Sequence, residues 1–176
     1  MRYALKLHPQ SRCEAVTGID VDVALEAPDR LLLGYRLIGR IADLRLPPLT
    51  PSERGDRLWE HSCLEAFIRT ATGTAYYEYN FSPSTQWAAY RLEDYRSGMT
   101  AAAAYPRVEI GSSADWLGLR ATIRLPTDAG HALGLSAVIE EINGRKSYWA
   151  LAHPSREPDF HHGDCFAAQL PGMTDG

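Results

Sequence analysis

Residues 58–68 combine side chains that could bind a ligand with side chains that would fill a core. The odd positions carry Trp59, His61 and Glu65. Successive side chains of a strand point to opposite faces, so these three would share one face. A carboxylate within a strand is costly to bury without a partner, so we expect Glu65 to face solvent, a groove or a cation. The apolar residues at even positions, which predict a core face, are Leu58, Leu64, Ala66 and Ile68.

Residues 76–91 alternate aromatic and polar side chains in the same way. Glu78 and Asn80 would share one strand face, with tyrosine and phenylalanine on the other. Residues 82–85 read as a turn, and Trp87 begins the next strand. The stretch therefore predicts a hairpin with one face of hydrogen-bond donors and acceptors.

Two further segments add charged and aromatic side chains. Arg96 lies in a polar loop that follows the hairpin, at residues 93–98. Trp149 and His153 have the spacing that places them on one face of a strand, and His161 precedes the last predicted strand.

The recurrence of these residue types is typical of a saccharide site. A flat aromatic ring covers the apolar face of a pyranose, while carboxylate, amide and guanidinium groups hydrogen-bond its hydroxyls. The same residue types also pack in the cores of all-β proteins, so a purely structural role is open for each. The candidate ligand-binding residues are Trp59, His61, Glu65, Glu78, Asn80, Trp87, Arg96, Trp149, His153 and His161.

An alternation of period two recurs along the chain and predicts the strands that would position these residues. It is clear at residues 19–25 and 117–125, while residues 31–41 and 133–142 are apolar enough for more deeply buried strands. Asn-Gly at 143–144 tolerates the positive φ angles of a two-residue turn, which predicts a hairpin there.

Helical signals are weak by comparison. Four alanines at 101–104 are bounded by Gly98 and Pro106, which leaves room for one or two helical turns. Prolines remove backbone donors from residues 46–56 and 154–159, so we expect loops. Strands without intervening helices favour an all-β fold. We predict an antiparallel β-sandwich of jelly-roll-like form, with a closed barrel as the alternative.

Length and composition are those of a single globular domain. The chain has 176 residues, of which 45% are hydrophobic and 23% charged. We expect one domain over residues 1–171 and a frayed tail at 172–176. Cys13, Cys63 and Cys165 are too few and too far apart for a disulfide framework, so free thiols are expected, and a Cys63–Cys165 bridge stays open.

The charge balance argues against nucleic acid as a partner. Eighteen Lys and Arg stand against 22 Asp and Glu, which gives a net charge of -4 without a basic run. No segment reaches the length of a transmembrane helix, and no signal-peptide core follows the N-terminus. We therefore expect a cytoplasmic protein without membrane association. The sequence leaves protein partners open.

Residues 59–68, followed by residues 77–83 and Trp87, resemble the bacterial DOMON-like proteins, relatives of the family 9 carbohydrate-binding modules. Residues 149–166 are similar to the closing part of the same pattern. The resemblance implies a β-sandwich that binds a ligand without catalysis, with sugars and haem as ligand classes. It further implies that Trp59 and Trp149 clasp the sugar. Glu65 matches an acidic position on the central strand, and Glu78 and Asn80 match the polar face.

Two other functions are compatible with the same residues. Haem iron takes methionine or histidine as axial ligands, so a haem site could use Met99 and one histidine. The candidate histidines are His61, His153, His161 and His162. Glycoside hydrolysis is also open, because Glu65 and Glu78 on neighbouring strands would supply the two carboxylates that this chemistry needs.

The sequence requires no cofactor. Histidine, acidic and cysteine residues gather between His153 and Cys165, but the paired spacings of zinc sites are absent from the sequence. A calcium site stays open as an alternative, because calcium is bound by carboxylate and carbonyl oxygens and this segment contains acidic residues. The resemblance also implies it, since some sugar-binding relatives carry structural calcium.

Overall fold

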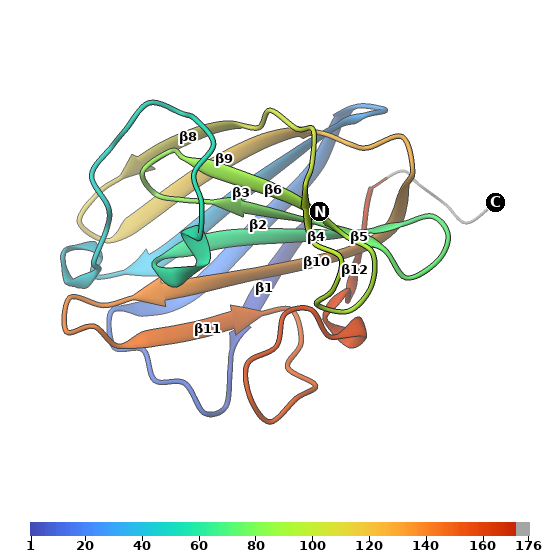
Figure 1. The fold of residues 1–176 in the computed structure, drawn as a ribbon. Coiled ribbons are helices and arrows are strands. Elements are labelled where there is room, and N and C mark those ends of the chain that lie inside the picture. Colours follow the sequence, from blue (N-terminus) through green and yellow to red (C-terminus); the bar gives the residue numbers. More distant parts are fainter. Residues whose placement is uncertain (172–176) are drawn as a thin grey trace.

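A computed structural model describes residues 1–171, and they form an all-β fold (Figure 1). The expected tail at 172–176 lies outside the described residues. Three short 3-10 turns accompany the strands: η1 (Ile41–Asp43), η2 (Leu58–Glu60) and η3 (Gly163–Cys165). The strands are β1 (Arg2–Leu7), β2 (Val16–Ala27), β3 (Arg30–Gly39), β4 (Cys63–Thr70), β5 (Tyr76–Phe81), β6 (Trp87–Leu92), β7 (Thr100–Ala101), β8 (Arg107–Ser112), β9 (Trp116–Arg124), β10 (Ala129–Glu140), β11 (Lys146–Ala150) and β12 (Ala168–Gln169).

The strands form two antiparallel layers, as expected for a sandwich. Sheet A has the order β1-β2-β3-β9-β8, and sheet B the order β7-β6-β5-β4-β10-β11, with β12 beside β10. The layers are continuous at one edge, where Lys6 of β1 pairs with Ala150 of β11. The chain therefore folds as one curled sheet whose halves face each other, which is the predicted jelly-roll-like sandwich (Figure 1).

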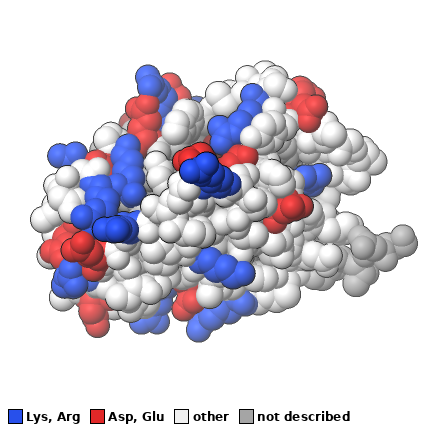
Figure 2. Space-filling model, turned by 90° about the horizontal axis from the view of Figure 1, so that it is seen from below, with Lys and Arg blue, Asp and Glu red and all other residues white. Residues whose placement is uncertain are grey.

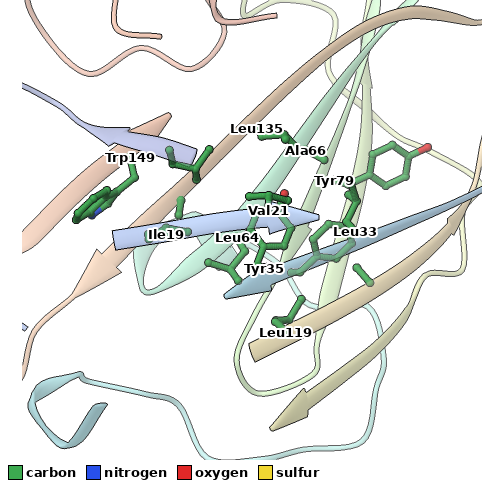
Figure 3. Close-up of a cluster of buried hydrophobic side chains, with 14 of the residues drawn as sticks. Ile19, Val21, Leu33, Tyr35, Leu64, Ala66, Tyr79, Leu119, Leu135 and Trp149 are labelled. Atoms are coloured by element: carbon green, nitrogen blue, oxygen red, sulfur yellow. The ribbon is translucent and has the colours of Figure 1, made fainter. Parts of the chain in front are cut away.

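The main core fills the space between the two sheets. Ile19 and Val21 of β2 and Leu33 of β3 meet Leu64 and Ala66 of β4 (Figure 3). All five are at most 1% exposed, and each belongs to the apolar half of an alternating strand. Burial of a Leu, Ile or Val side chain contributes roughly 1.5–3 kcal/mol. This core fixes which face of β4 points inward.

The outer face of sheet B is buried as well. Phe67, Tyr76, Tyr90 and Leu92 form a second apolar cluster there, against which Phe160 packs. Phe160 belongs to the covering segment (residues 152–167), which follows β11 and lies over this face (orange to red in Figure 1). Both faces of β4 and β5 are therefore shielded from water, and polar side chains on the outer face are enclosed.

The predicted strands are present, and so is the hairpin around residues 143–144. Its turn is longer than the expected two residues, because the Glu141 amide bonds the Arg145 carbonyl oxygen and only Gly144, with φ 83°, has a positive φ. Residues 46–56 and 154–159 contain no helix or strand, as expected. The alanine run at 101–104 contains no helical turn. Instead, Ala101 pairs with Tyr90 of β6, because the edge of sheet B offers backbone partners that an isolated helical turn would lack.

The expected strand over residues 58–68 begins later, at Cys63. Arg57 adopts a left-handed conformation with φ 52°, and the amides of Glu60 and His61 then bond the carbonyls of Arg57 and Leu58. Residues 58–60 are therefore a 3-10 turn at the entrance to β4. The strict alternation of faces holds only from residue 63 onward.

All three cysteines are free thiols, and Cys63 and Cys165 are both buried, so the open possibility of a bridge is not realised. Within residues 1–171, no helix is long and apolar enough to cross a membrane. Acidic and basic side chains are interspersed over the face of the molecule shown in Figure 2.

Candidate functional site

The outer face of sheet B carries a pocket of about 420 Å³ between the sheet and the covering segment. Strands β4, β5 and β10 supply its floor. One wall comes from the η2 turn and residues 92–99, and another from β11 and the covering segment. The lining residues are Trp59, Glu65, Glu78, Leu92, Arg96, Met99, Val138, Tyr148, Pro158, Phe160 and His161.

Strand register places two carboxyl groups side by side on the floor. Glu65 of β4 lies opposite Asn80 of β5 and opposite Ser136 of β10. Glu78 lies two residues before Asn80 and therefore on the same face. Ser136 Oγ donates to Glu65 Oε2 at 2.9 Å, and Asn80 Nδ2 donates to Glu78 Oε1 at 2.8 Å.

Burial makes these carboxyl groups weak acids. The exposed fractions of Glu65 and Glu78 are only 3% and 5%. Loss of hydration raises the pKa of Glu65 to about 8, with a further rise from neighbouring Glu78 and a smaller offset from the Ser136 hydrogen bond. Burial also raises the pKa of Glu78, against the hydrogen bond from Asn80 and the charge of Arg96. At neutral pH the pair therefore retains a proton and can both donate and accept.

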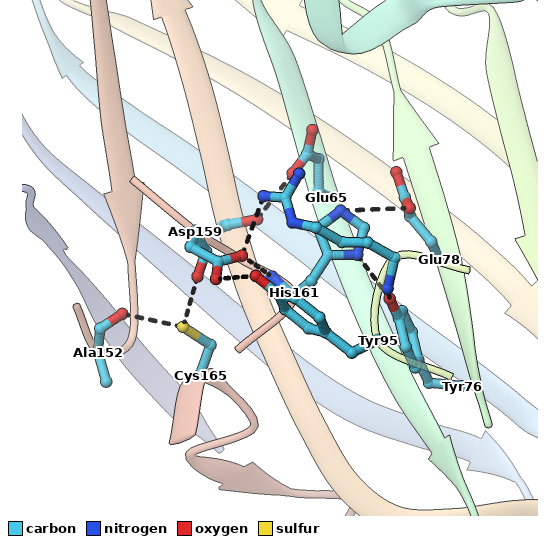
Figure 4. A network of polar contacts seen from close by, with 10 residues as sticks. Glu65, Tyr76, Glu78, Tyr95, Ala152, Asp159, His161 and Cys165 are labelled. Carbon is cyan, nitrogen blue, oxygen red and sulfur yellow. Dashed lines mark hydrogen bonds and ion pairs between the residues drawn. The ribbon is translucent and has the colours of Figure 1, made fainter. Parts of the chain in front are cut away.

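His161 extends over this floor from the covering segment (Figure 4). Tyr76 Oη and His161 Nδ1 are 2.7 Å apart, and His161 Nε2 lies 3.9 Å from Glu78 Oε2. Burial, helped by the charge of Arg96, lowers the pKa of His161 to about 4, so the imidazole is neutral near pH 7. Tyr76 Oη already accepts from the amide of Arg96 at 3.2 Å. Tyr76 can therefore donate to Nδ1, which leaves the proton on Nε2 facing Glu78.

Asp159 ties the covering segment to the loop before β7. Its carboxylate accepts from Tyr95 Oη at 2.7 Å and from Arg96 Nη2 at 3.0 Å (Figure 4). Burial alone would raise the pKa of Asp159, but these two hydrogen bonds and the guanidinium charge lower it. Cys165 Sγ anchors the same segment by donating to the carbonyl oxygens of Asp159 at 3.1 Å and Ala152 at 3.4 Å. The cover is thus a fixed part of the pocket.

Aromatic rings complete the walls. The Trp59 ring meets the Tyr90 ring edge to face, with centroids 5.8 Å apart. The ring centroid of Phe160, in the covering segment, lies 6.2 Å from that of Tyr148 on β11. The half-buried Trp59 side chain is therefore held against sheet B while part of it lines the pocket.

The pocket brings together five of the ten candidates named from the sequence: Trp59, Glu65, Glu78, Arg96 and His161. Asn80, fully buried, lies beside them through its bond to Glu78. Of the candidate haem ligands, Met99 also lines the pocket.

The structure places Trp87 and Trp149 in the main core (Figure 3 shows Trp149), with exposed fractions of 6% and 5%. Both belong to the inward half of their strands. Trp149 Nε1 donates to Ser147 Oγ at 3.0 Å, so the one polar atom of the indole side chain has a hydrogen-bond partner. Neither side chain lines the pocket.

His61 and His153 also lie outside the pocket lining. His61 Nδ1 is 2.7 Å from Glu140 Oε2, at the end of β10. His153 Nε2 is 2.7 Å from the Lys6 carbonyl oxygen, with its ring edge-on to His8. Within residues 1–171, no group of three or more His, Cys, Asp or Glu side chains is arranged to hold a metal ion.

Sequence reasoning missed Ser136, Tyr148 and Phe160. Ser136 reads as an ordinary polar position in an apolar strand, and Phe160 lies in a loop without periodicity. Tyr148 belongs to the predicted hairpin strand after 143–144 and could have been found, because it alternates with core-facing Trp149.

Solved structures of other proteins share this fold. A proposed carbohydrate-binding protein from Bacteroides uniformis ATCC 8492 superposes with a TM-score of 0.62 at 12% identity, over 97% of this chain and 84% of that one. A family 9 carbohydrate-binding module from Caldicellulosiruptor kristjanssonii, in complexes with glucose and with cellotriose, gives a TM-score of 0.48 at 13% identity. These two superpositions cover 98% and 97% of this chain and 86% and 84% of theirs.

At these identities the similarity defines the fold, and the argument for it rests on the Bacteroides protein. The chain shares the β-sandwich fold of that protein. No protein-family model matches the sequence, and no curated protein matches it either.

Proposed function

We propose that this protein is a non-catalytic binding domain for a small saccharide or a similar polar ligand, held in the pocket on sheet B. One observation carries the proposal: the Trp59 ring and the Glu65–Glu78 pair line the same pocket. A pocket of about 420 Å³ lies within the usual range for small-molecule sites, which combine apolar walls with a few convergent polar groups.

The chemistry of the lining suits a sugar ring. Trp59 and Phe160 offer apolar ring surface, while Glu65, Glu78 and Arg96 offer hydrogen-bonding groups. The carboxyl pair retains a proton, so it can accept from one hydroxyl and donate to another. The fold shared with a proposed carbohydrate-binding protein supports this ligand class. We also assign the chain to the DOMON-like relatives of such proteins, on the motif around Trp59 and Glu65.

Titration calorimetry tests the proposal with a panel of neutral mono- and disaccharides. Trp59→Ala should weaken binding of any responsive sugar at least tenfold, because it removes the ring surface. Trp116→Ala is the matched control, because Trp116 is also half-buried but lines a separate hollow of about 540 Å³ on the outer face of sheet A, with Arg36 and Glu109. Loss of binding in this variant alone would place the sugar in that hollow. Absence of binding at millimolar sugar, or equal binding by wild type and Trp59→Ala, would contradict the proposal.

Glycoside hydrolysis is the second candidate, favoured by the raised pKa of Glu65 beside a second buried carboxyl group. Glycosidases place an acid and a base or nucleophile on either side of the scissile bond. Glu65 and Glu78 instead extend from adjacent strands of one sheet face, so both approach a ligand from the same side. This geometry favours binding. Release of nitrophenol from aryl glycosides by wild type, but not by Glu65→Gln, would reverse the order of the two candidates.

A further inference from the structure

The two carboxyl groups of the floor differ from the other buried carboxylates of this protein. Glu140, at the end of β10, is 3% exposed and pairs with Arg45 at 3.0 Å and with His61 at 2.7 Å. Glu141 is 4% exposed, accepts from two backbone amides and lies 3.8 Å from Arg145. Among the described residues, no Lys or Arg forms an ion pair with either Glu65 or Glu78. Of the buried acids among residues 1–171, only the two in the pocket lack an Arg partner.

The groups that face this pair from each neighbouring element leave its charge unmatched. Ser136 on β10 is neutral, and so is His161 in the covering segment near pH 7. The guanidinium of Arg96 lines the same pocket and lowers the pKa of Glu78, but its ion pair is with Asp159 at 3.0 Å. Cys63 lies on the same face of β4 as Glu65, and Tyr35 of β3 lies on the core side of the sheet; both are buried and neither adds a positive charge. Tyr76 and Tyr90, on β5 and β6, are phenols whose pKa values burial raises further.

A fully buried oxygen beside the pair also lacks a partner. Asn80 Nδ2 donates to Glu78, but Asn80 Oδ1 accepts no hydrogen bond. Asn80 lies directly across from Glu65 on the same sheet face. Buried amide oxygens are almost always satisfied in native proteins, so this unpaired oxygen shows that hydrogen-bond acceptors outnumber donors beside the carboxyl pair.

We propose that the pocket selects a saccharide that carries a protonated primary amine, whose ammonium group binds over Glu65 and Glu78. The inference rests on the proposed saccharide function and specifies its ligand. An ammonium has three N–H donors and no acceptor, which complements the carboxyl oxygens of Glu65 and Glu78 on the floor. Trp59 in the wall adds the negative face of its ring, a surface that attracts organic cations. The aromatic walls suit an organic cation better than a hydrated metal ion.

Binding of the cation should expel a proton from the floor. In the free protein, burial holds the Glu65 carboxyl protonated near pH 7. An ammonium supplies the missing positive charge, so Glu65 ionises in the complex and its proton passes to the buffer. About one proton is released for each ligand bound. A neutral sugar would not release it, because no charge replaces the proton.

Calorimetry at pH 7 with D-glucosamine, D-glucose and N-acetyl-D-glucosamine tests the proposal. The three ligands share one ring, and the charged amine is present only in the first. We expect glucosamine to bind at least tenfold more tightly than the other two. Its binding enthalpy should differ between phosphate and HEPES by the difference between the ionisation enthalpies of the two buffers, multiplied by about one proton. Equal affinity for glucosamine and glucose, or equal enthalpies in the two buffers, would overturn the inference and leave saccharide binding intact. No binding of any of the three would refute both.

Variants without the carboxyl charge test whether Glu65 and Glu78 cause the preference for glucosamine. Glu65→Gln and Glu78→Gln keep the shape of each side chain, and each should reduce the preference for glucosamine over glucose at least fivefold. Glu26→Gln, exposed on β2, is the matched control and should retain the wild-type preference. Denaturant unfolding of each variant verifies the fold. A wild-type preference in both floor variants would contradict the assignment of the ammonium site to this pair.

Discussion

The Glu65 carboxyl group should make the protein less stable as pH rises through the neutral range. Its pKa is about 8 in the folded protein, against an ordinary value of 4.5 for an exposed glutamate in the unfolded chain. Between these two pH values the folded protein keeps a proton that the unfolded chain has lost. The stabilising contribution is therefore complete below about pH 4.5 and is lost as pH rises toward 8.

The magnitude follows from the same interval. Stability changes by about 1.4 kcal/mol per pH unit for one proton, so the interval from 4.5 to about 8 corresponds to roughly 5 kcal/mol. A typical domain has a free energy of unfolding of about 5–15 kcal/mol, so this change is large. Glu78 acts in the same direction, because its pKa is also raised.

Urea unfolding at pH 5, 6.5 and 8 measures the effect in wild type and Glu65→Gln. Glutamine does not ionise, and its amide oxygen can still accept from Ser136 Oγ. The variant should match wild type within about 1 kcal/mol at pH 5 and exceed it by roughly 3–5 kcal/mol at pH 8. The exposed control Glu26→Gln should follow wild type throughout. Parallel pH curves for wild type and Glu65→Gln would refute the account of a protonated, buried Glu65.

Two further predictions concern the fold that supports the pocket. Tyr35→Phe removes a buried hydrogen bond of 2.7 Å from β3 to the Glu65 carbonyl oxygen, and should lower the free energy of unfolding by about 1 kcal/mol in urea titrations. Gly39→Ala should cost at least about 2 kcal/mol, because Gly39 has φ 151° and an added Cβ would lie 2.0 Å from the Ala15 carbonyl oxygen. Gly18→Ala, with open space at the Cβ position, is its matched control and should change stability little in the same assay.

The strands could be read from the sequence because their signals are local. Alternation at residues 19–25 and 117–125 marks one buried face, and the Asn-Gly pair at 143–144 locates the hairpin, although only Gly144 adopts the positive φ of the expected turn. Alternation also assigned Glu65 and Glu78 correctly to strand faces opposite the main core. It failed at residues 58–62, where the left-handed Arg57 leaves no compositional trace.

What the sequence by itself determined is a set of two-faced strands and the residue types that each face carries. Only the tertiary structure decided which faces meet. Trp87 and Trp149 lie in segments that combine aromatic and polar residues, as Trp59 does. The packing of sheet A against sheet B nevertheless buries both of them in the main core. The covering segment closes over the other face of sheet B and turns Glu65, Glu78 and His161 into one site. That closure depends on contacts between residues distant in the chain, such as Arg96 with Asp159, which periodicity does not encode.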